Sequence, residues 1–247
     1  MKKLILMLWL MPGLILAQSK IDKTFGLNGS KKISLNFKYP ELIRVHTWDK
    51  DEVVIRGTVS INGGQHDDSF TLEAKTEQQE LIVTSNIENI DQIPKKTFVK
   101  TDGGVRFFND ASWNSPEVQQ YIGEHKGEHE YVTHGVHKEI TLEVYVPGHV
   151  ELEVFSKYGL VEVAGISKAL TVNAKYGGID VSFSNSKVGD VTASTKFGEI
   201  YTDLDFDFIQ QGATSDDHNK WTVITYTQSE GLKVGLESKY GNIYLRK

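Results

Sequence analysis

Short runs of alternating apolar and polar residues flank a corner motif that recurs four times in the second half of the chain. The four copies begin at Lys157, Lys175, Lys196 and Lys239, and each continues with Tyr-Gly or Phe-Gly. Five and three positions before each lysine, and again four and six positions after it, the residue is nearly always Leu, Val or Ile. Alternation at period two is typical of half-buried strands. Each repeat is therefore predicted to form a strand, a corner and a second strand.

The copies are 18, 21 and 43 residues apart, so the last gap corresponds to about two periods or to one long excursion. Like residues recur in like columns, as stacked coils require. We predict an all-β fold of β-solenoid type, a single-stranded β-helix or β-roll-like stack of strand-corner-strand coils with two long loop insertions. A meander or sandwich of hairpins is the alternative, because a glycine turn is also a hairpin signal.

The corners are assigned a structural role. Their aromatic rings are expected to point inward and to be buried, and the glycines to allow a positive φ or a bulge where the alternation slips by one residue. The alternative is a repeated ligand-binding array of lysine and aromatic side chains. The corner residues are Tyr158, Gly159, Tyr176, Gly177, Phe197, Gly198, Tyr240 and Gly241.

Further strands are expected in the N-terminal part, around 33–37, 42–45, 53–55, 70–74 and 81–83. Between about 86 and 137 the periodicity fades, which indicates a long loop insertion that can contain one or two short strands. A second excursion runs from Asp205 to about Ser229. Long loops often carry function, so the exposed aromatics Trp113 and Trp221 are predicted partner contacts.

Residues 1–17 have the layout of a signal peptide, with Lys2 and Lys3 before an apolar run that ends at Ala17. We expect its removal to leave one domain, 18–247, that is exported to the periplasm, the outer surface or the medium. No later segment is apolar enough to span a membrane, and there is no cysteine. The remaining 25 basic and 33 acidic residues give a formal net charge of −8, which disfavours nucleic-acid binding.

The segment from Val144 to Val154, with its Val146-Pro147-Gly148 step and the corners that follow, resembles the bacterial putative-adhesin family, an exported domain of unknown function. The segment from Trp48 to Val53 is similar to an early strand-turn-strand of that family. The resemblance covers most of the chain after 17 and is strongest from Ile140 to Lys247. It implies a single-domain β-solenoid with no established catalytic residues, and a role in adhesion.

Two groups of side chains are candidates for chemistry. His125, His129, His134 and His137, with Glu124 before them and Glu128 and Glu130 between them, are residue types that ligate zinc or copper, but their spacing matches no zinc signature. Glu162 and Asp180 occupy one outward column and are the pair that a glycan-cleaving enzyme would need. A solvated loop and an ordinary polar strand face explain these groups better. Asp216-Asp217 alone is a weak sign of calcium.

The predicted function is that of a non-catalytic, exported, adhesin-like protein without cofactor, which contacts a surface glycan or protein through its strand faces and long loops. The alternatives are a glycan-active β-helix enzyme and a structural scaffold. The final strand, around 242–245, runs almost to the C-terminus and is expected to leave an open edge through which a homodimer could form.

Overall fold

The computed structural model describes residues 18–109, 112–127, 129–165, 168–183, 188–212, 221–228 and 230–247. The predicted signal peptide, 1–17, and the pair Asp216-Asp217 lie outside the described residues. Within the described ranges, no helix has the length and hydropathy needed to cross a membrane.

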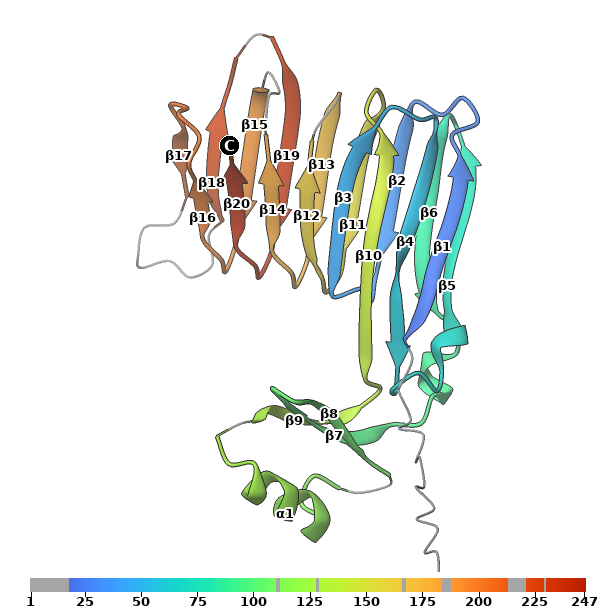
Figure 1. The fold of residues 1–247 in the computed structure, drawn as a ribbon. Helices are drawn as coiled ribbons and strands as arrows, with labels where there is room; N and C mark the ends of the chain where they lie inside the picture. The colour runs from blue at the N-terminus through green and yellow to red at the C-terminus, as the bar shows by residue number, and fades with distance from the viewer. Residues whose placement is uncertain are drawn as a thin grey trace, which may run out of the picture.

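Two large β-sheets face each other, and a smaller unit is attached below them (Figure 1). The eight-stranded sheet contains, in spatial order, β1 (Ser19–Gly26), β4 (Glu52–Ile61), β10 (Lys138–Pro147), β3 (Leu42–Trp48), β12 (Leu160–Ala164), β14 (Ile179–Ser182), β20 (Ile243–Arg246) and β16 (Ile200–Thr202). The nine-stranded sheet contains β17 (Ile209–Gln211), β18 (Thr222–Tyr226), β15 (Val188–Thr195), β19 (Leu232–Ser238), β13 (Ala169–Ala174), β11 (Glu151–Ser156), β2 (Lys32–Phe37), β6 (Glu80–Ile87) and β5 (Phe70–Glu77). The one-turn helices η1 (Asp67–Ser69) and η2 (Ile90–Gln92) lie in connections.

The core between the two sheets is made by the apolar half of each alternating strand. Leu152 and Val154 of β11 pair with Leu170 and Val172 of β13, and all four are buried. On the opposite sheet, Val161 of β12 lies beside buried Ile179 and Ile43. The repeated columns seen in the sequence are thus in register across neighbouring strands.

The prediction of a β-solenoid is nevertheless wrong. The strands form two large mixed sheets. In one, β4 pairs antiparallel with both β1 and β10; in the other, β6 pairs antiparallel with β5, and β18 pairs antiparallel with both β15 and β17. In addition, β19 and β20, the last strands of the chain, lie between strands of the second and third repeats. The order of strands in space therefore does not follow their order in the chain, as it would in coils stacked one after another.

The C-terminal strand β20 lies inside its sheet and not at the expected open edge. It pairs with β14 on one side and with β16 on the other. The ends of the two sheets are formed instead by β1 and β16, and by β5 and β17. The terminal strand therefore offers no free edge to a second copy of the chain.

The corners explain two of the repeated sequence positions. The hydroxyl of buried Ser238 accepts a hydrogen bond from the Gly241 amide (2.8 Å) and donates one to the Gly177 carbonyl (2.9 Å). Thr195 makes the same two kinds of contact, to the Gly198 amide and the Gly241 carbonyl. In three of the four repeats the residue before the lysine, Ser156, Thr195 or Ser238, thus supplies a hydroxyl that holds its own corner, and Thr195 and Ser238 also hold the neighbouring one.

The four corner glycines have no positive φ, so the first of the two conformations expected from the sequence, a positive φ or a bulge, is wrong. A Cβ at Gly177 would overlap the carbonyl group of Gly159, and a Cβ at Gly241 would overlap that of Gly177. Glycine is required here because the backbones of neighbouring corners approach too closely for any side chain.

Replacing Ser238 by alanine is expected to destabilise the fold by about 2 kcal/mol, because two buried backbone groups, the Gly241 amide and the Gly177 carbonyl, lose their hydroxyl partner. Equilibrium denaturation in urea measures this change. The control is Thr192→Ala at an exposed position of β15, for which a change below about 0.5 kcal/mol is expected. Equal stability of the two variants would contradict the role given to the hydroxyl.

The segment from about 86 to 137, predicted as a loop insertion, contains a folded unit. Its sheet has the order β8 (Gly104–Phe108), β7 (Lys96–Thr101) and β9 (His129–Gly135), and α1 (Pro116–Glu124) packs on it. The Ser115 hydroxyl caps α1 by accepting from the Val118 amide, and buried Val99, Phe108 and Val118 form a small core. The segment lacked a clear sequence signal because α1 separates β8 from β9, so that its alternating runs are neither continuous nor repeated.

Candidate functional site

Five lysines lie immediately after the ends of five adjacent strands of the nine-stranded sheet, where the corners begin. In spatial order they are Lys38, Lys157, Lys175, Lys239 and Lys196, and we call them the lysine row. The residues just before them pair directly across the strands, and four of the five backbone amides donate to the neighbouring strand. Neighbouring strands are about 4.8 Å apart. The row is therefore a line of evenly spaced backbone positions that runs across the strands.

The positive charge of the lysine row is not neutralised within the protein. Among the described residues, no carboxylate forms an ion pair with any of the five ammonium groups. Each group lies over the ring that follows it in the chain, 4.8–5.3 Å from the ring centre. At the other end of β2, by contrast, Lys32 is bound by Glu153 (2.5 Å) and Glu80 (3.2 Å).

The corner rings form a second line, which we call the aromatic row: Tyr158, Tyr176, Tyr240 and Phe197. Neighbouring ring centres are 5.0–5.4 Å apart and the planes are within 13° of parallel. The rings are 44–51% exposed, so the prediction that they point inward and are buried is wrong. The strand alternation ends at the lysine, where the chain bends, and the ring is carried to the outside of the corner.

A groove of about 820 Å³ lies beside the lysine row and is lined by all five of its members. Its floor consists of outward residues of β2, β11 and β13, namely Asn36, Phe155 and Asn173, which pair directly across the sheet. Trp221, half-buried before β18, also lines it. The two acidic lining residues, Glu73 and Glu237, leave a surplus of three positive charges.

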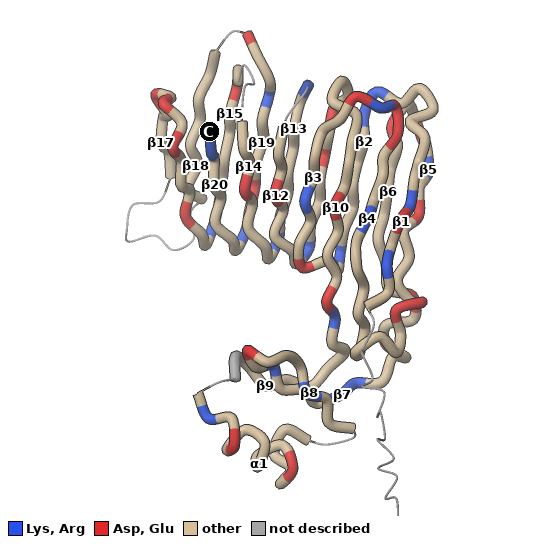
Figure 2. Tube along the Cα trace, viewed as in Figure 1, with Lys and Arg blue, Asp and Glu red and all other residues tan. Residues whose placement is uncertain are grey.

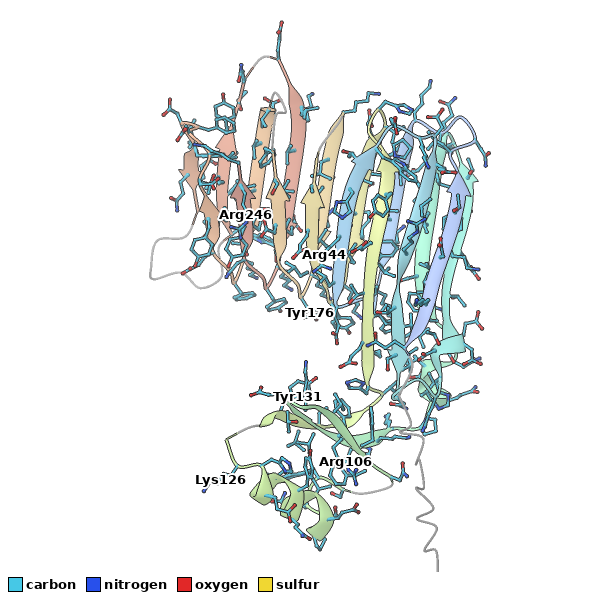
Figure 3. The ribbon with its side chains drawn as sticks, viewed as in Figure 1. Arg44, Arg106, Lys126, Tyr131, Tyr176 and Arg246 are labelled. Atoms are coloured by element: carbon cyan, nitrogen blue, oxygen red, sulfur yellow. The ribbon has the colours of Figure 1, made fainter. Side chains whose placement is uncertain are left out.

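The figures show where this site lies in the fold. Figure 2 shows a series of Lys or Arg segments at successive bends below β12, β14, β20 and β16. Figure 3 labels Tyr176 at these bends, and it labels Arg44 and Arg246 on the strands of the eight-stranded sheet. The lysine and aromatic rows thus follow one rim of the pair of sheets.

The candidate acid pair lies on the eight-stranded sheet, away from the groove. Glu162 and Asp180 are directly paired on β12 and β14, as their column predicted. The Arg44 guanidinium donates to Glu162 (2.8 Å), and that of Arg246 donates to Asp180 (2.7 and 2.9 Å). Both carboxylates therefore belong to a strand face on which acids and arginines compensate each other.

The candidate histidines do not converge. His125 stacks on Tyr121, and His134 bonds Thr97 (3.0 Å). His137 is buried between Phe98 and Phe107, and its burial lowers its pKa. The side chains of His129 and Glu130, and Glu128 as a whole, lie outside the described residues. In the part of the chain that is described, no group of three or more His, Asp or Glu side chains is placed to hold a metal ion.

The two tryptophans predicted as partner contacts have different surroundings. Trp221 lines the groove, whereas Trp113 lies in the turn before α1, where it is 57% exposed and its carbonyl accepts from the Gln119 side chain (2.9 Å). Only Trp221 is thus part of the candidate site.

Sequence reasoning missed the first corner, Lys38-Tyr39-Pro40. Ile33 and Leu35 stand five and three positions before Lys38, as in the other repeats, and they occupy the same columns in space. Pro40 replaces the glycine, and one additional residue precedes the next strand, so that Ile43 lies beside Val161. A search for Lys followed by an aromatic residue, with these upstream columns and no required glycine, would have found it.

Comparisons with known proteins give only distant similarities. No protein-family model and no curated protein matches the chain. A crystal structure of a putative cell adhesion protein from Clostridium sporogenes aligns over 93% of this chain and 99% of its own, with 11% identity and a TM-score of 0.49. A putative adhesin from Bacteroides fragilis aligns over 93% and 97%, with 8% identity and a TM-score of 0.31.

Proposed function

We propose that this protein is a non-catalytic, exported binding protein of the adhesin-like kind, which holds an extended anionic partner in the groove beside the lysine row. The observation that carries the proposal is the line of five lysines without an ion-pair partner among the described residues, on a chain whose net charge is negative. The N-terminal segment 1–17 supports export, since it has the layout of a signal peptide.

The energetics of the lysine row favour a ligand over a purely architectural role. Like charges on directly opposed strand positions destabilise a sheet by roughly 0.2–1 kcal/mol per pair. The cation–π contacts to the corner rings recover a similar amount, about 0.5–1 kcal/mol each at exposed sites. The row therefore contributes little to stability, while an anionic ligand would gain from every lysine at once. The opposite sheet shows the compensated arrangement, with Arg44 beside Glu162 and Asp180 beside Arg246.

A glycan-cleaving enzyme is the second candidate, and the groove geometry favours binding without cleavage. Paired carboxylates in glycoside hydrolases are about 5–10 Å apart. Glu73 of β5 and Glu237 of β19 are separated by five strand spacings, about 24 Å. Glu162 and Asp180 are adjacent, but both are held by arginines on the opposite sheet.

Retention on a cation exchanger tests the proposal, because a chain with a sequence pI near 5.8 would ordinarily pass through such a column at pH 7.5. The chain from Gln18 to Lys247 is expected to bind, since the column presents an anionic surface to the whole lysine row. The triple variant Lys157→Glu, Lys175→Glu, Lys239→Glu is expected to elute in the flow-through. Binding should weaken as salt rises, because exposed charges are screened.

The matched control is Lys20→Glu, Lys23→Glu, Lys75→Glu, which changes the net charge equally at exposed positions of β1 and β5. It is expected to be retained like the original chain. If the original chain flows through, or if both triple variants lose retention equally, the groove is not an anion-binding surface.

A further inference from the structure

We propose that the groove binds a linear acidic polysaccharide, whose chain lies across the strands with its carboxylates along the lysine row. This inference rests on the proposed function and adds the chemical class of the partner. Three observations support it: the spacing of the lysines, the composition of the groove floor and the orientation of the aromatic rings.

The spacing of the row distinguishes between linear polyanions. Successive lysines originate about 4.8 Å apart, so the five span about 19 Å. In an extended peptide successive residues advance by only ~3.4 Å and their side chains point to opposite sides, and in B-DNA the phosphates of one strand follow each other every ~3.4 Å along the axis. A linear chain of hexuronic acids carries one carboxylate per sugar, and each sugar ring advances the chain by about one strand spacing. Successive carboxylates are turned about the chain axis, and the long, flexible lysine side chains can follow them. The row therefore matches four to five consecutive acidic sugars.

The groove floor offers more than positive charge. Phe155 is 38% exposed and lies between Asn36 and Asn173 on the adjacent strands. Amide groups can donate to and accept from sugar hydroxyls, and a flat ring can pack against the apolar C–H face of a sugar. Trp221 supplies another such surface. A simple phosphate or sulfate ion could accept from the amides but would use neither aromatic surface.

The aromatic row disfavours single-stranded nucleic acid as the partner. Proteins hold single strands by stacking bases on exposed ring faces. Here each ring of the aromatic row is covered by its neighbour at about 5 Å, so the inner faces are occupied and the ring edges face solvent. The negative net charge of the chain also opposes a phosphate backbone.

The test uses titration calorimetry with oligogalacturonates of one to eight sugars on the chain from Gln18 to Lys247. Affinity is expected to be undetectable for the monomer, to rise with each sugar and to level off at about five, when every lysine is engaged. Neutral cellopentaose, pentaglutamate and a five-nucleotide oligothymidylate are the comparison ligands, and all three are expected to bind at least tenfold more weakly than the pentagalacturonate.

Variants then test the groove itself. Lys175→Gln, at the centre of the row, is expected to lower the affinity for the pentamer about threefold, as one exposed ion pair allows. Phe155→Leu should lower it to a similar extent by removing the flat surface. Lys75→Gln on β5, whose lysine pairs with Glu77 outside the groove, is the control and should leave the affinity unchanged. Thermal denaturation of each variant verifies that it is folded.

The outcomes separate the inference from the proposed function. Tighter binding of pentaglutamate or oligothymidylate than of pentagalacturonate would overturn the polysaccharide assignment and name the other class as the partner. Retention on the cation exchanger without oligogalacturonate binding would also overturn it, while leaving an anion-binding groove. If the chain is neither retained on the cation exchanger nor binds oligogalacturonate, both the proposed function and the polysaccharide assignment are overturned.

Discussion

A chain that ends at Gln228 is expected not to fold. Such a chain lacks β19 and β20, and each of these strands pairs on both sides, β19 with β13 and β15, and β20 with β14 and β16. The buried side chains lost are Val234, Leu236, Ile243 and Leu245. At about 1.5–3 kcal/mol each, their burial contributes about 6–12 kcal/mol, which is comparable to the whole stability of a typical domain.

Circular dichroism and limited proteolysis of the chain that ends at Gln228 measure the loss of folded structure. The control starts at Leu27 and lacks β1, an edge strand that pairs only with β4 and whose side chains are mostly exposed. We expect this control to remain folded, with a lowered melting temperature. A solenoid that loses its last coil would stay folded as a shorter stack, so a stable chain ending at Gln228 would contradict the interleaved strand order.

The strands were predictable because their signal is local. Alternation at period two identifies which side of each strand faces the core, and Leu152, Leu170, Val191 and Val234 could be aligned by their distance from the following lysine. The structure places these four in one line across the sheet.

The order of the strands was not predictable from the same signal. Leu, Val and Ile fill similar volumes, so the strand of one repeat packs equally well beside the equivalent strand of any other repeat. The 43-residue gap before Lys239 is consistent with a fourth coil at the end of the stack. In the structure this coil lies between the second and third copies, a choice made by long-range packing that no single repeat encodes.

The candidate site was only partly predictable. The lysines and rings could be recognised as repeated. The rings were expected in the core because the alternation of inward and outward residues was assumed to continue past the lysine, where the strand in fact ends. Exposure of Tyr158 and its equivalents changes the interpretation, because burial no longer explains why the aromatic residue is repeated. The role of Trp221 in the groove depends on how β18 packs on β15, which the sequence does not indicate.

Gly177→Ala is expected to destabilise the protein by about 3 kcal/mol or more, which would lower the melting temperature by about 6–12 °C in a chain of this size. The added Cβ would overlap the backbone carbonyl of Gly159. That backbone cannot move away freely, because the Tyr176 amide donates to the Lys157 carbonyl (3.0 Å) and the Val161 amide donates to the Gly178 carbonyl (3.0 Å). Differential scanning calorimetry of the variant measures the change.

Gly123→Ala is the matched control, because Gly123 lies in α1 and a Cβ there would meet no atom within 4 Å. Alanine is favoured over glycine in a helix by about 1 kcal/mol, so this variant should be slightly more stable than the original chain. If Gly177→Ala were as stable as this control, neighbouring corners would have to lie further apart than the structure places them. The lysine row would then be spaced more widely as well, and it would no longer match one acidic sugar per strand.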